Sequence, residues 1–109
     1  MQTIAISVNG TDTMEVPAYL HGKFAVNLPP GSGPYIGGPK EAYCNITHVA
    51  TGLRVMSVWG RAAARRIARR LDEAVKHDIT ADDWSQKSAQ WRAFVAIVGP
   101  IVKGGEVAA

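Results

Sequence analysis

Basic side chains concentrate in one short segment of the sequence, residues 60–76, which holds six basic and two acidic residues. The segment before it is neutral and the segment after it carries a charge of −1, so residues 60–76 account for the whole excess in a net charge of +3. The six basic residues are Arg61, Arg65, Arg66, Arg69, Arg70 and Lys76. Guanidinium groups grip phosphates and carboxylates in a bidentate manner, so this segment predicts recognition of an anionic partner.

The spacing of these residues predicts an amphipathic helix over residues 60–77. Arg61, Arg65 and Arg69 recur every four residues, which places them in a stripe of about 12 Å at 1.5 Å per residue. Arg66 and Arg70 form a second row beside it. The apolar residues share the opposite arc: Ala63, Ala64, Ile67, Ala68, Leu71, Ala74 and Val75. A binding face and a merely solvated Ala/Arg-rich helix face both fit this pattern.

Other chemistry finds little support in the sequence. His21, His48 and His77 have neither metal-ligand spacing nor an evident catalytic partner, and we expect His48 to face Arg54 across a hairpin. The single Cys44 excludes an intrachain disulfide and fits a reducing compartment. We therefore expect a non-catalytic protein without metal or cofactor.

Residues 29–39 contain four prolines and four glycines, which excludes a helix or an interior strand. The glycines lack the spacing of a phosphate-binding loop. We expect an exposed loop, with Tyr35 and Ile36 at its middle as a second candidate contact for a partner.

Alternating apolar residues predict strands before and after this loop. A three-residue turn near Asn9-Gly10 would pair Val8 with Asp12, Ile6 with Met14 and Ile4 with Val16. Pro17 should end the second strand or lie on an edge, and residues 23–28 suggest another strand. A hairpin over residues 42–59, turning at 50–52, would pair the following residues: Val49 with Leu53, Thr47 with Val55, Ile46 with Met56, Cys44 with Val58 and Tyr43 with Trp59.

A capping box formed by Thr80 and Asp83 predicts the start of a last helix. Its apolar face would contain Trp84, Trp91, Phe94, Val95 and Val98. We expect Trp84 and Trp91 to pack in the core, Trp59 to be more open, and Gly99-Pro100 to stop or kink the helix.

These elements predict an α+β fold of about four antiparallel strands, arranged as two hairpins and followed by two helices packed on one face of the sheet. Residues 1–102 would form the single domain and residues 103–109 a flexible tail. The sequence shows no signal peptide and no membrane-spanning run, which favours a cytoplasmic protein.

Residues 43–71, YCNITHVATGLRVMSVWGRAAARRIARRL, resemble a pattern found in small uncharacterised proteins of bacteriophages and other mobile elements. The pattern combines a strand ending in Thr-His, a Thr-Gly turn, a return strand and an Ala-rich helix. Proteins of this origin include inhibitors of bacterial immunity, among them anti-CRISPR proteins. The resemblance implies an accessory protein that binds and inhibits or modulates a host complex, such as a bacterial defence nuclease complex.

The partner would be a host protein or nucleoprotein complex with an acidic or phosphate-bearing surface. The Arg-rich helix is the expected contact. The alternative is a DNA- or RNA-binding module that uses the same helix, because the same arginine rows fit phosphates. The sequence leaves the oligomeric state open.

Overall fold

Five antiparallel strands form one sheet in the part of the chain that the structure describes. This computed structural model describes residues 2–8, 12–28 and 43–108, with side chains up to Lys103. The strands pair in sequence order and are β1 (Gln2–Val8), β2 (Asp12–His21), β3 (Phe24–Asn27), β4 (Tyr43–His48) and β5 (Leu53–Trp59). The strand predicted at residues 23–28 is confirmed as β3, which lies between the two hairpins, so the sheet has one strand more than the expected four.

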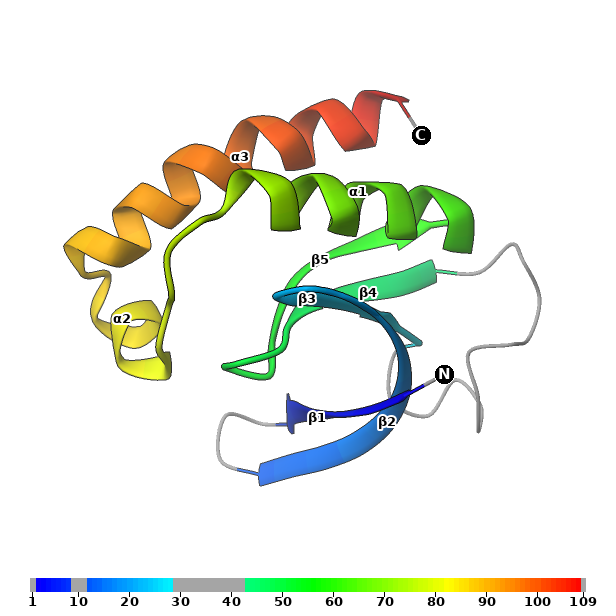
Figure 1. Ribbon diagram of the computed structural model, residues 1–109, viewed down its shortest axis with the longest axis horizontal. Coiled ribbons are helices and arrows are strands. Elements are labelled where there is room, and N and C mark those ends of the chain that lie inside the picture. The colour runs from blue at the N-terminus through cyan, green and yellow to red at the C-terminus, as the bar shows by residue number, and fades with distance from the viewer. Residues whose placement is uncertain (1, 9–11, 29–42, 109) are drawn as a thin grey trace.

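Three helices follow the strands within the described residues: α1 (Arg61–Ala74), α2 (Ala81–Gln86) and α3 (Ala89–Ala108). Helix α1 contacts β2, β3, β4 and β5, while α3 packs on α1 and α2 packs on α3. Figure 1 shows α1 and α3 side by side above the sheet. The predicted α+β class, with helices on one face, is confirmed.

The main hydrophobic core lies between α1, α3 and the sheet. Alternate residues of β3 and β4 point into it, and the apolar stripe of α1 covers them. Burying a large aliphatic side chain contributes roughly 1.5–3 kcal/mol, so this stripe fixes α1 on the sheet. The fully buried side chains include Phe24, Val26, Cys44, Ile46, Ala64, Ala68, Leu71, Val75, Ile79 and Phe94.

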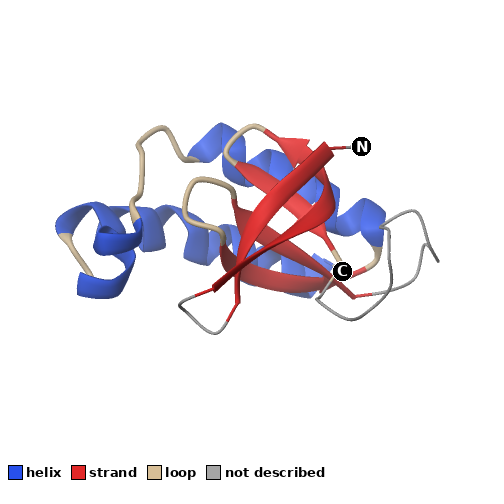
Figure 2. Cartoon of the chain, turned by 90° about the horizontal axis from the view of Figure 1, so that it is seen from below, coloured by secondary structure: helices blue, strands red, loops and turns tan. Residues whose placement is uncertain are grey.

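The sheet is strongly curled (Figures 1 and 2), and residues of β1, β2 and β3 form a second, smaller core. The backbone N–H of Ser7 in β1 donates to the carbonyl of Gly52 in the β4–β5 turn, at 2.7 Å. A Cβ on Gly52 would lie only 3.0 Å from the Ala5 carbonyl oxygen, and its φ is +72°. A glycine is therefore needed where the two ends of the curl meet. The small core contains Ile4, Ile6, Val16, Ala18 and Ala25.

The first hairpin has the predicted register, because Ile4 lies opposite Val16, Ile6 opposite Met14 and Val8 opposite Asp12. Strand β2 does not end at Pro17, but Pro17 lies where β2 has a neighbouring strand on one side only among the strands described, which is the edge position that was the other predicted outcome. Pro17 lies opposite Thr3 of β1, whereas β2 pairs with β3 only from Tyr19 onward. Within the described residues no second strand pairs with β2 at this position, so the N–H that proline lacks is not needed for a hydrogen bond to such a strand.

The predicted register of the second hairpin is confirmed at its open end and is wrong near its turn. The pairs Ile46–Met56, Cys44–Val58 and Tyr43–Trp59 are confirmed, but Thr47 lies opposite Arg54 and His48 opposite Leu53. An irregularity after Ile46 leaves Val55 as the extra residue of a β-bulge. The predicted pairs Thr47–Val55 and Val49–Leu53 do not form. The Gly52 N–H donates to the His48 carbonyl at 2.8 Å, which closes a longer turn than expected.

Helix α1 is shorter than predicted, because Val75 adopts an extended conformation after Ala74. The last helix is divided. The capping box at Thr80 is confirmed, but α2 ends at Gln86, because the next residue, Lys87, takes a left-handed φ of 53°. Ser88 joins the two helices, since its hydroxyl donates to Asp83 Oδ1 at 2.7 Å and accepts from the Trp91 N–H at 3.2 Å.

Helix α3 continues through Gly99 and Pro100, so of the two predicted outcomes the stop is wrong, and the kink stays a prediction. Proline removes one intrahelical hydrogen bond, to the carbonyl four residues earlier. That residue, Ala96, is exposed, so water can satisfy the carbonyl. The backbone is helical to Ala108, and the flexibility expected of residues 103–109 stays a prediction.

Candidate binding surface on α1

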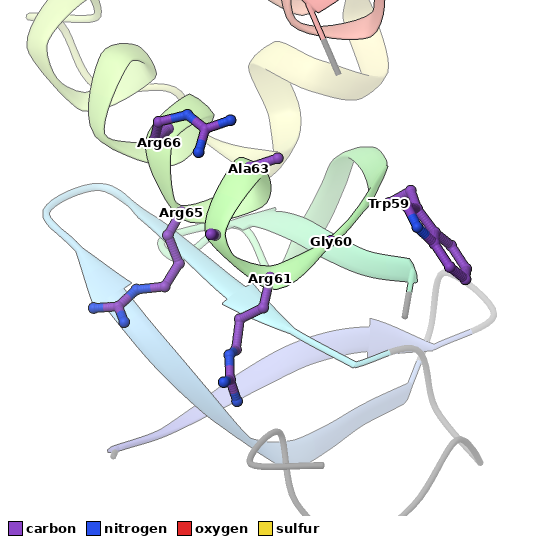
Figure 3. Close-up of a pocket in the computed structure, with 7 residues that line it drawn as sticks. Trp59, Gly60, Arg61, Ala63, Arg65 and Arg66 are labelled. Atoms are coloured by element: carbon purple, nitrogen blue, oxygen red, sulfur yellow. The ribbon is translucent and has the colours of Figure 1, made fainter. Parts of the chain in front are cut away.

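The basic side chains of α1 do not share one environment. Arg66, Arg69 and Arg70 are exposed, as is Lys76 beyond the end of the helix, whereas Arg61 and Arg65 are half-buried. Figure 3 shows Arg61 and Arg65 extending to the same side of the helix, with Arg66 on another side. The structure therefore divides the first row, because Arg61 and Arg65 are half-buried whereas Arg69 is exposed like Arg66 and Arg70.

Arg65 attaches α1 to strand β2. Its Nε donates to His21 Nε2 at 3.2 Å, and its guanidinium carbon lies 4.2 Å from the ring centroid of Tyr19. His21 accepts this hydrogen bond through a ring nitrogen without a proton, so the imidazole is neutral. Partial burial, followed by the charges of Arg65 and Arg69, lowers the pKa of His21, and Asp72 opposes this.

Asp72 makes a second attachment one turn beyond the arginine rows. Its carboxylate Oδ1 accepts from the backbone N–H of Lys23 at 2.9 Å, across the turn between β2 and β3. Gly22 in that turn has φ +63°, and a Cβ there would overlap the Asp72 carboxylate. This side of α1 is consequently held to the sheet by specific polar contacts.

An open pocket of about 590 Å³ lies at the N-terminal end of α1. Its lining residues are Trp59, Gly60, Arg61, Ala62, Ala63, Arg65 and Arg66, most of which are labelled in Figure 3. Gly60 is the N-cap, it supplies no side-chain cap, and the first turn has no acidic residue. The partial positive charge of the helix N-terminus therefore adds to that of the guanidinium groups.

Two aromatic rings stand beside this pocket at the end of the β4–β5 hairpin. The side chain of Trp59 is 49% exposed and that of Tyr43 is 59% exposed. Their ring centroids are 4.9 Å apart in a T-shaped arrangement, which is a favourable geometry for two aromatic rings. Trp59 is thus more open than Trp84 and Trp91, as expected.

The other two tryptophans belong to the core, as predicted. Trp84 and Trp91 are half-buried, pack against Phe94 and lie with their ring centroids 4.7 Å apart. Val95, which we placed on the same face, is 43% exposed. A small apolar groove runs beside Trp84 and Trp91 toward Val102.

His48 is not at the surface opposite Arg54, which corrects the expectation from the sequence. It is 2% exposed, and its ring packs edge-on against Phe24 and Phe94. His48 Nδ1 and Thr51 Oγ1 share a hydrogen bond of 3.0 Å. Burial lowers the pKa of His48, with Asp78 opposing the shift. The β-bulge explains the error, because it places Leu53 rather than Arg54 opposite His48.

The remaining candidate chemistry is limited. Burial raises the pKa of the Cys44 thiol, with the Arg61 charge opposing this, so its thiolate is disfavoured. Among the residues described, no three His, Cys, Asp or Glu side chains gather to hold a metal ion. The described helices include none with the length and apolarity needed to cross a membrane. Tyr35 and Ile36, the predicted loop contacts, lie outside the described residues.

Sequence reasoning missed the contacts of Arg65 with Tyr19 and His21, which lie more than forty positions earlier in the chain. It paired Tyr43 with Trp59 but did not connect them to the arginine rows. The only available signal was that Trp59 precedes Arg61 by two positions.

Comparison with other proteins adds no relative. Searches against protein-family models, curated proteins and solved structures found no match to this chain.

Proposed function

We propose that this chain is a non-catalytic accessory protein of a bacteriophage or mobile element, acting in the cytoplasm of a bacterial host. It binds a host macromolecular complex through the basic face of α1 and inhibits or modulates that complex. A bacterial defence nuclease complex is one such target. The partner presents an acidic or phosphate-bearing surface.

The observation that carries this proposal is the exposure of Arg66, Arg69 and Arg70 on a helix that is fixed to the sheet. Long arginine side chains lose conformational entropy when they bind, but a rigid helix already sets their spacing. Exposed guanidinium groups also accelerate encounter with an anionic surface through electrostatic steering. Arg65 contributes to positioning the helix, since it contacts His21 and Tyr19.

The test is affinity capture from a bacterial host lysate, with and without nuclease. We expect wild-type protein to retain a defined host complex and the double variant Arg66→Glu/Arg70→Glu to lose it. Arg92→Glu/Lys103→Glu is the matched control, because both residues are exposed on α3 and the two substitutions make the same total change in charge. Circular dichroism checks that all three proteins are folded.

Equal capture by the double variant and by the control would reject α1 as the contact. Loss of inhibition of the captured nuclease complex in the double variant would support the proposal further. Arg65 is unsuitable for this test, because its substitution also disturbs the attachment of α1 to β2.

A further inference from the structure

We infer that the pocket at the N-terminal end of α1 binds single-stranded nucleic acid, with a phosphate on the arginines and a base stacked on Trp59. This inference rests on the proposed function in using the same helix, and it names one ligand class for that surface. Its support comes from the pocket and the aromatic pair beside it.

The charge of the pocket selects an anion. Three of its seven lining residues are arginines, and none of the seven is acidic. Figure 3 shows Arg61 and Arg65 extending to one side of the helix end and Arg66 to another, and all three arginines line the pocket. Planar guanidinium groups match the geometry of phosphate oxygens. Backbone N–H groups of the first helical turn, which lack a side-chain cap, add further donors.

The aromatic pair selects a planar group beside that anion. Trp59 lines the pocket and remains 49% exposed, although an indole gains more than most side chains from burial. The Tyr43 ring packs edge-on against the Trp59 indole, with the two ring centroids 4.9 Å apart. This contact limits how far the indole can rotate. A ring that is already oriented loses less entropy when a base stacks on it.

Single strands fit this combination better than duplexes do. Bases in a duplex are stacked on one another, so their faces are not available to an indole, whereas an unpaired base exposes its face. The pocket has a volume of about 590 Å³ and is confined to one end of α1. The site therefore suits a short contact of a few nucleotides.

Fluorescence anisotropy with a labelled ten-nucleotide oligothymidylate tests the inference on the purified full chain. A ten-base-pair dA·dT duplex and inorganic polyphosphate serve as the competing probes. With about three phosphate contacts on a single strand, affinity should fall about twentyfold between 50 and 200 mM salt. Duplex and polyphosphate should compete at least tenfold more weakly than unlabelled oligothymidylate.

Variants separate stacking from charge. Trp59→Ala should weaken oligothymidylate binding about tenfold or more, and Trp59→Phe, which keeps a ring, should stay within about threefold of wild type. Arg66→Glu should also weaken binding at least tenfold. Leu20→Ala and Arg92→Glu are the matched controls, since both residues are exposed and lie outside the pocket. Each should change the affinity less than about twofold.

Tryptophan emission gives an independent readout. Stacking should quench Trp59 on addition of oligothymidylate, and the Trp59→Phe protein should bind without quenching, because Trp84 and Trp91 lie in the core. Absence of binding at 50 mM salt, equal affinity for duplex, or unchanged affinity in Trp59→Ala would each overturn the inference.

The two proposals can fail separately. Nuclease-resistant capture that is lost in Arg66→Glu/Arg70→Glu but kept in Trp59→Ala, together with no oligothymidylate binding, would reject this inference and retain the proposed function. Oligothymidylate binding without any captured host complex would reject the proposed function and retain this inference.

Discussion

Both sides of α1 carry arginines, but one side contacts the sheet and the other is exposed. On one side, Arg65 and Asp72 contact β2 and the β2–β3 turn through His21, Tyr19 and the Lys23 backbone. On the other side, Arg66 and Arg70 are exposed. An arginine that completes the fold and an arginine that is available to a partner thus differ by one position in sequence. The attached side should govern stability and the exposed side should govern binding.

The largest expected effect on stability is at the turn that receives Asp72. Gly22→Ala places a side chain at φ +63° and against the Asp72 carboxylate. Loss of that hydrogen bond together with backbone strain should lower the free energy of unfolding by about 2–4 kcal/mol. Urea denaturation followed by circular dichroism measures it.

Gly99→Ala is the matched glycine control. Gly99 lies in α3, and apart from its chain neighbours and the backbone of its own helix no atom lies within 4 Å of its Cβ position. The helix propensity of alanine and the restriction that Pro100 places on the residue before it oppose each other, so the free energy of unfolding should change by less than about 1 kcal/mol. A loss in Gly22→Ala no larger than that in Gly99→Ala would contradict the proposed attachment at Gly22.

The next prediction compares the stability of two variants, one at an arginine that contacts β2 and one at an exposed arginine. Arg65→Met keeps an apolar stem but removes the guanidinium that contacts Tyr19 and His21, which should cost about 1–2 kcal/mol of stability. Arg66→Met removes an exposed guanidinium and should change stability by less than about 0.5 kcal/mol. Thermal and urea unfolding of both variants measure the difference, and equal losses would contradict the division.

The smallest expected effect is a dependence of the free energy of unfolding on pH. The pKa values of His21 and His48 are lowered in the folded protein, mainly by burial. The unfolded chain therefore binds protons first, and stability should fall as pH drops below about 6.5. Protonated His21 can no longer accept from Arg65.

His21→Gln sharpens this comparison, because the glutamine carbonyl can still accept a hydrogen bond but does not titrate. Stability of this variant should fall less steeply between pH 7 and pH 5 than that of wild type. His77→Gln is the matched control for replacing a histidine. Urea midpoints across that range give the slopes, and identical slopes for wild type and His21→Gln would remove His21 from the explanation.

The parts of the fold predicted correctly are those encoded by local patterns. Alternation in residues 4–8 and 12–16 was enough for the register of the first hairpin, because a slip of one residue would turn Ile4 and Ile6 to the wrong face. The apolar stripe of α1 and the capping box at Thr80 were likewise readable from spacing.

The errors lie where distant residues decide the local structure. The β-bulge at Val55 places His48 opposite Leu53, with the His48 ring among Phe24 and Phe94. The break after α2 depends on Ser88 bonding both Asp83 and Trp91. In these two segments the sequence pattern fits the predicted and the observed local structure almost equally well, and tertiary packing determines which one forms.

The sequence alone determined that a helix near residue 60 would be amphipathic and basic, because a period of 3.6 residues sorts charged and apolar side chains onto opposite faces. Only the tertiary structure decided which arginines are available. The Arg65 guanidinium lies over the Tyr19 ring and donates to His21 because α1 packs against β2. Such contacts join elements by three-dimensional proximity, which a one-dimensional periodicity does not encode.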